Sequence, residues 1–141
     1  MPATQPESKA RLKLYYKWRP QIVVDFHEMG RNRTYFFQPG IPSRNNPNTP
    51  KNVFYLTNLL AEHHAEALNN IGSLYYSKES FDDFYYGKGS TFPDINGSVG
   101  ILFEQASSRA LKTTTTSGEL NYAFTIKNHF NASLGTLEGL W

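Results

Sequence analysis

The sequence of 141 residues contains no cysteine, which excludes disulfides, thiolate metal ligands and cysteine nucleophiles. It also lacks any run of about 18 consecutive apolar residues, so no transmembrane helix is expected. The first seven residues lack the apolar stretch of a signal peptide, and the chain itself assigns no compartment; a secreted or periplasmic location would need such a peptide in a longer precursor. A strong excess of one charge is absent too, since the formal net charge is +2.

Apolar and aromatic residues are plentiful, at 39% and 15% of the sequence, and they suffice for the core of one domain. Most of the basic residues lie in the first 51 positions, and several of them share a short segment with helical spacing. These are Lys9, Arg11, Lys13, Lys17 and Arg19. We interpret them as the solvated face of a helix, and we expect no nucleic-acid binding.

The N-terminal part of the sequence predicts a helix followed by a strand. The helix covers residues 7–18, where Thr4 and Glu7 have the spacing of a capping box, and Pro20 ends it. Residues 21–27 form a short run of β-branched and aromatic residues that is nearly apolar throughout. This pattern favours a strand that is covered on both faces.

The stretch 30–50 is rich in proline, asparagine and serine, which predicts a loop without regular structure. Thr49 then caps a helix that has Pro50 at its first position and ends at Gly72. One apolar face of this helix is predicted from the helical spacing. It consists of Val53, Leu56, Leu60, His64, Ala67 and Ile71.

The C-terminal part predicts a second strand at residues 98–105 and a polar loop at 113–117. Thr116 and Glu119 have the spacing of another capping box, which would begin the last helix. Its predicted apolar stripe is Leu120, Ala123, Ile126, Phe130, Leu134 and Leu137. Helices that alternate with strands in this way are typical of an α/β domain.

The segment DFHEMG, residues 25–30, is the sharpest local signal for chemistry. It places His27 at the carboxyl end of a predicted strand, where α/β sheets bind ligands. Strand alternation puts Asp25 on the same side, so that its carboxylate could orient the imidazole. A His-Glu-x-x-His zinc motif is excluded because Arg31 stands where the second histidine would be. The alternative interpretation of His27 is a purely structural histidine.

A second signal is Glu104, which lies late in an otherwise apolar strand. Burying a carboxylate there is costly unless it has a partner, and such environments tune carboxylates for general acid–base catalysis. The alternative is a residue at the strand end that reaches solvent. His63 and Glu66 have His-x-x-Glu spacing, but we interpret them as part of an ordinary amphipathic helix surface. The glycine-punctuated aromatic segment 84–92 could cover a site or pack on the core.

Four segments in this order resemble the zinc carboxypeptidases, the carboxypeptidase A-like metallopeptidases, and bacterial members most closely. They are residues 20–30, residues 34–40 (TYFFQPG), residues 85–93 (YYGKGSTFP) and residues 97–107 (GSVGILFEQAS). The resemblance covers nearly the whole chain. It implies part of a mixed central sheet flanked by helices.

The resemblance also implies roles for individual residues. His27 matches the family's later zinc ligand, and Glu104 matches the general base that activates the zinc-bound water. Tyr86, or alternatively Tyr85, matches the mobile tyrosine that closes over the substrate. The expected cofactor is therefore one zinc ion, and the expected partner is a peptide with a free C-terminal carboxylate.

One departure from the family is prominent. The family's His-x-x-Glu zinc ligands and its substrate-binding arginines precede the His27 position, where this chain has only 26 residues and no histidine. Residues 1–141 are therefore expected to be the C-terminal portion of a metallocarboxypeptidase-like catalytic domain, truncated at the N-terminus and prone to self-association through exposed sheet edges. A fragment, a degenerate paralogue and one half of a split enzyme all fit. A related zinc amidohydrolase or deacylase, or a non-catalytic peptide- or sugar-binding module, is the alternative function.

Overall fold

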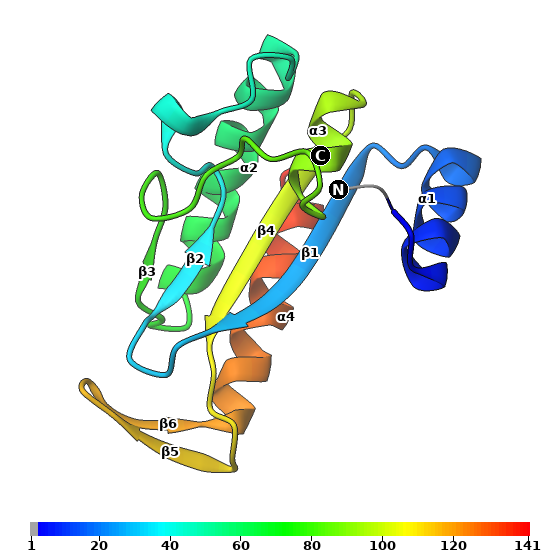
Figure 1. Ribbon diagram of the computed structural model, residues 1–141. Helices are drawn as coiled ribbons and strands as arrows, with labels where there is room; N and C mark the ends of the chain where they lie inside the picture. The colour runs from blue at the N-terminus through cyan, green and yellow to red at the C-terminus, as the bar shows by residue number, and fades with distance from the viewer. Residues whose placement is uncertain (1–2) are drawn as a thin grey trace.

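The computed structural model describes residues 3–141 and shows a mixed α/β fold, which confirms the predicted fold class (Figure 1). Its main sheet has the strand order β1-β4-β2-β3. The strands are β1 (Ile22–Met29), β4 (Val99–Ala106), β2 (Tyr35–Phe37) and β3 (Tyr75–Tyr76). Because β1 pairs with β4 in parallel and β2 pairs with β4 antiparallel, the sheet is mixed.

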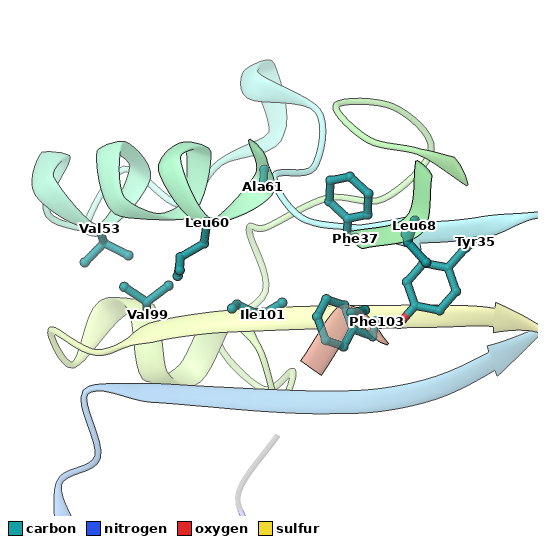
Figure 2. Close-up of a cluster of buried hydrophobic side chains, with 10 residues drawn as sticks. Tyr35, Phe37, Val53, Leu60, Ala61, Leu68, Val99, Ile101 and Phe103 are labelled. Atoms are coloured by element: carbon teal, nitrogen blue, oxygen red, sulfur yellow. The ribbon is translucent and has the colours of Figure 1, made fainter. Parts of the chain in front are cut away.

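Two long helices, α2 (Lys51–Asn69) and α4 (Tyr122–Glu138), pack against each other and against one face of the sheet, here called the helical face. Side chains of β2 and β4 meet the helices there (Figure 2). Burying each of these large apolar side chains is worth about 1.5–3 kcal/mol. The buried core comprises Tyr35, Phe37, Val53, Leu60, Ala61, Leu68, Val99, Ile101, Phe103 and Ala132.

The opposite face of the sheet, here called the Glu104 face, carries the short helix α3 (Thr91–Ile95) over β4. Gly100 permits this contact, because a Cβ atom there would overlap the backbone carbonyl of Ser90. A further helix, α1 (Pro6–Trp18), precedes β1 and projects beside the sheet, and none of residues 6–18 is buried (Figure 1). No helix in residues 3–141 is long and apolar enough to cross a bilayer.

The prediction of an irregular loop over residues 30–50 is wrong in part. The stretch contains β2 and a short 3₁₀ helix, η1 (Pro42–Arg44). Tyr35, Phe36 and Phe37 are almost completely buried between β4 and β3. The prolines follow this aromatic run, so they do not interrupt its hydrogen bonding. A strand of three residues was missed because the composition of the whole stretch is typical of a loop.

The predicted start of the last helix is also wrong. Residues 112–121 form a hairpin of β5 (Lys112–Thr115) and β6 (Gly118–Asn121), with a turn at Thr116 and Ser117 where a polar loop and a capping box were expected. Asn121 is the actual cap, since its side-chain oxygen accepts a hydrogen bond of 2.8 Å from the Phe124 N–H. The polar threonine run therefore forms a strand, β5, which pairs with β6, where the sequence predicted a loop.

The orientation of α4 differs from the prediction as well. Four residues of the expected apolar stripe face outward and are exposed: Ile126, Phe130, Leu134 and Leu137. The buried side consists mainly of small and polar residues, namely Thr125, Asn128, Ala132, Gly135 and Thr136. The close approach of α2 explains this, because a Cβ atom on Gly135 would lie only 2.8 Å from the carbonyl oxygen of His63.

Strand β1 is not covered on both faces as predicted. Among residues 3–141 it pairs with β4 alone, and Phe26 remains 51% exposed. The cap predictions at Thr4 and Thr49 fail too. The N-cap residues are Gln5 for α1 and Pro50 for α2, and neither makes a capping hydrogen bond through its side chain.

Candidate functional site

The two residues singled out for chemistry lie directly opposite each other on neighbouring strands. The register of the parallel pair aligns His27 on β1 with Glu104 on β4. Since residues in register on adjacent strands point to the same face, both side chains lie on the Glu104 face near the carboxyl ends of the strands. They are 77 positions apart in the sequence, and only the β1–β4 pairing brings them together.

Asp25 lies two residues before His27 on the same face of β1. Its Oδ2 atom is 3.0 Å from Nε2 of His27. The carboxylate is mostly covered, whereas the imidazole is about half exposed. This contact fixes the ring through one nitrogen and leaves Nδ1 as the nitrogen that can meet another group.

The carboxyl group of Glu104 is partly buried, and this burial raises its pKa. The positive charges of His27 and Lys88 oppose the shift, and the negative charge of Asp25 adds to it. A carboxylate whose pKa is raised above its ordinary value holds a proton more readily than an exposed surface glutamate. It is therefore suited to accept and return a proton.

The loop before α3 folds onto this cluster and contributes charge. Gly89 packs so closely on Asp25 that a Cβ atom there would overlap the carboxylate, and Nη2 of Arg11 on α1 would lie 2.5 Å from the same Cβ atom. Lys88 is anchored by a 2.6 Å ion pair with Asp82. Arg11 was predicted to lie on a solvated helix face, and the sequence pattern predicted no role for Lys88. The Gly-Lys-Gly sequence was the signal that could have indicated a close contact by this loop, because only a residue without a side chain fits against Asp25.

A buried pair of acids holds α3 and this loop against β4. Oδ1 of Asp94 accepts a 2.6 Å hydrogen bond from the Gly100 N–H, and Oδ1 of Asp83 accepts one of 2.7 Å from Thr91. Burial, together with the neighbouring Asp83, raises the pKa of Asp94 to about 9. Asp94 is therefore protonated at neutral pH. The pair serves the site indirectly, by positioning the segment that carries Lys88 and Gly89.

Tyr85 and Tyr86 lie at the start of the same loop. Their ring centroids are 5.7 Å apart, and both rings are partly exposed, at 40% and 55%. The Tyr85 ring packs over Gly87, and the Tyr85 carbonyl accepts a 3.0 Å hydrogen bond from the Lys88 N–H. Both tyrosines are thus tied to the loop that contacts Asp25.

The other histidines lie outside this cluster. His64 is fully buried under α4, where its Nε2 atom lies 2.9 Å from Oγ1 of Thr136, and burial lowers its pKa to about 4. The His63 ring packs against Gly139 near the end of α4, and Glu66 is exposed on α2. His129 reaches the Tyr35 hydroxyl at 2.9 Å on the helical face. The His-x-x-Glu spacing of residues 63–66 therefore marks a helix surface.

The ligand set of a complete metal centre is not present in the part of the chain that the structure describes. Within residues 3–141 no three histidine, aspartate or glutamate side chains converge as a group that could hold a metal ion. No family model, no curated protein and no solved structure matches this chain. The functional assignment therefore depends on the geometry of the cluster and on the resemblance of its sequence segments.

Proposed function

We propose that this chain forms the C-terminal part of a zinc-dependent metallocarboxypeptidase, which removes residues from the carboxyl end of peptides. The observation that carries the proposal is the pairing of His27 with Glu104 across β1 and β4, with Asp25 in contact with the imidazole. A candidate metal ligand beside a carboxylate of raised pKa suits hydrolysis by an activated water. The four ordered sequence segments support the same assignment.

The described residues supply one suitable zinc ligand but not the full set of ligands that a catalytic zinc site needs. His27 offers an exposed imidazole that a carboxylate orients, which is the usual setting of a zinc-binding histidine. A catalytic zinc needs about three protein ligands, so the remaining ligands would come from a polypeptide segment outside this chain. When bound there, the metal would supply Lewis acidity to the scissile carbonyl and to a water molecule.

The proposal gives the chain's own residues distinct tasks. Asp25 holds the His27 ring in one orientation. Glu104 takes a proton from the attacking water and later returns one to the leaving amine. Arg11 and Lys88 add positive charge beside the cluster, which suits a substrate with a free carboxylate. Tyr86, or alternatively Tyr85, contacts the substrate from the loop.

Reconstitution with the absent ligands tests the proposal. The chain is joined to the N-terminal half of a zinc carboxypeptidase that carries His-x-x-Glu, and release of C-terminal residues is measured together with zinc content. We expect Glu104→Gln to lower turnover by about 10²-fold or more while zinc is retained, since a general base contributes about 10²–10⁴-fold. His27→Ala should lose zinc and activity together.

Glu28 provides a matched control. It neighbours His27 in the sequence but points to the other face, where its Oε2 accepts a 2.7 Å hydrogen bond from Ser107. Glu28→Gln should leave turnover within a few-fold of the parent. If Glu104→Gln stays active with zinc bound, and Glu28→Gln does not, the proton acceptor is misassigned.

The chain by itself should bind zinc weakly, because one imidazole is a poor site. Purified protein is equilibrated with zinc and desalted, and the retained metal is measured by mass spectrometry. A stoichiometric zinc that survives His27→Ala would contradict the proposed ligand. Loss of such a zinc on changing His63 or Glu66 would point to the α2 pair instead.

Consecutive exposed aromatic residues favour one second candidate, a non-catalytic module that binds a peptide or a sugar. Phe84, Tyr85 and Tyr86 are all exposed on the loop before α3. Such a module would bind its ligand equally well in the presence of a chelator and after Glu104→Gln. A related zinc amidohydrolase or deacylase would share the chelator sensitivity of a carboxypeptidase, and an acyl-amino acid substrate would distinguish it.

A further inference from the structure

A cavity of about 200 Å³ lies at the carboxyl end of β4, away from the Glu104 cluster. It is open to solvent on one side and is lined by the loop after β1, the turn at 72–74, the β5–β6 hairpin and the start of α4. Oδ1 of Asn32 accepts a 3.1 Å hydrogen bond from the Thr116 N–H, which ties the hairpin to the loop after β1. A volume of this order holds a small molecule, since an engineered cavity of about 150 Å³ binds benzene.

One wall of the cavity contains a buried hydrogen-bond acceptor that has no partner. Asn128 on α4 lines the cavity and is only 1% exposed, and its Oδ1 atom has no hydrogen bond within residues 3–141. A buried polar atom left unpaired costs about 1–3 kcal/mol. A ligand that donates a hydrogen bond would remove this cost.

The identity of the unpaired atom follows from a chain of hydrogen bonds. The Ala106 carbonyl can only accept, so Gln105 must direct its amide nitrogen toward it, at 3.0 Å. The Gln105 oxygen then faces Asn128, which must donate from its own amide nitrogen, at 2.7 Å. The atom that remains on Asn128 is therefore the oxygen, an acceptor.

Two arginines supply positive charge to the same cavity. Arg31 and Arg33 both line it, and neither has an ion-pair partner in the described part of the chain. Glu119, the one carboxylate among residues 3–141 that lines the cavity, is paired with Lys112 at 2.9 Å. Guanidinium groups bind carboxylates through two parallel hydrogen bonds. The cavity thus offers a cationic side and a separate acceptor.

We propose that this cavity binds a small carboxylate that carries a hydroxyl or N–H donor next to the carboxylate group. The carboxylate is bound by Arg31 and Arg33, and the adjacent donor is bound by Oδ1 of Asn128. Gln105, which positions Asn128, points to the helical face, whereas its neighbour Glu104 points to the other. The site is therefore separate from the proposed hydrolytic cluster, and its occupancy does not depend on zinc.

Lactate and propionate are suitable probes, because they have similar size and differ in the hydroxyl donor. Each is titrated into the full chain and followed by the amide shifts of residues around the cavity. Lactate should bind at least about fivefold more tightly than propionate, since only lactate satisfies Asn128. Equal affinity for the two probes would overturn the proposal, as would shifts that avoid the cavity.

Arginine variants test the cationic side. Arg31→Ala combined with Arg33→Ala should weaken lactate binding by about tenfold or more. Arg44→Ala is the control, because Arg44 is an exposed arginine in η1 and does not line the cavity. Unchanged lactate binding in the double variant, or an equal loss in the control, would overturn the assignment.

Discussion

Two phenylalanines that are cross-strand partners have opposite environments. Phe103 on β4 is completely buried between the sheet and the helices, whereas its partner Phe26 on β1 is 51% exposed. The sheet therefore has a closed side, built on β4, β2 and α2, and an open side, built on β1, the outer surface of α4 and α1. The difference shows that the hydrophobic core of this chain is off-centre with respect to its sheet.

The candidate site lies where the two sides meet. Glu104 belongs to the buried central strand, and His27 belongs to the strand that has a single neighbour within residues 3–141. The Phe26 ring packs edge-on against His129 of α4, and Ile126 and Phe130 of the same helix are exposed as well. Under the proposed function, the other zinc ligands belong on this open side, next to β1.

Substituting the two paired phenylalanines should give the largest contrast in stability. Phe103→Ala empties a fully packed position and should lower the free energy of unfolding by about 3–5 kcal/mol. Phe26→Ala removes a half-exposed ring and should cost about 1 kcal/mol or less. Urea unfolding followed by circular dichroism gives both values. Similar losses at the two positions would contradict the division into a closed and an open side.

The closed side was largely predictable from the sequence, and the open side was not. The apolar run of β4 predicted its burial correctly, and so did the helical spacing around Leu60 and His64. Both predictions succeed because these segments pack against partners within the chain. The same kind of run in β1 predicted burial that the described residues do not supply. Local patterns report which faces are apolar, whereas coverage depends on distant segments.

Individual residues of the candidate site could be predicted from the sequence, but their arrangement in space could not. His27 and Glu104 stood out as polar groups at strand ends, but their placement opposite each other depends on strand register, which the sequence did not specify. Arg11 was hidden for a different reason. Its approach to Asp25 depends on how α1 docks beside the sheet, and the sequence of α1 did not specify that orientation.

The acid pair beneath α3 should make the stability of the folded chain sensitive to pH. Asp94 has a pKa of about 9 in the folded chain, well above that of an unfolded aspartate. Between about pH 4 and pH 9 the folded state therefore binds one more proton, so stability falls as the pH rises, by up to about 1.4 kcal/mol per pH unit. Asp94→Asn mimics the protonated form and should flatten this slope.

Thermal or urea unfolding between pH 5 and pH 9 measures that slope. The control is Glu62→Gln, which changes an exposed carboxylate on α2 and should leave the slope as it is. An unchanged slope in Asp94→Asn would show that the acid pair does not govern the pH dependence.

The open side should drive association of the isolated chain, because exposed apolar faces and unpaired strand edges favour it. Phe26→Lys combined with Phe130→Glu should lower the oligomeric fraction in light scattering several-fold. Tyr55→Lys is a matched control, since Tyr55 is an equally prominent exposed aromatic on α2. A monodisperse parent chain, or equal effects in the control, would argue against an interacting open side.

The smallest effect is expected at α1, whose docking depends on few contacts. The Ser98 hydroxyl donates to the Pro20 carbonyl at 2.6 Å, so the Tyr15 hydroxyl must donate to Ser98, at 2.7 Å. Tyr15→Phe removes this bond, worth about 1 kcal/mol, and keeps the edge-on ring contact with Phe92. Amide exchange in α1 should therefore quicken while the melting temperature stays nearly constant.

Tyr16→Phe is the control, because its ring also meets Phe92 but its hydroxyl has no hydrogen bond within residues 3–141. A fall in melting temperature as large as that of Phe103→Ala would place α1 in the same cooperative unit as the core.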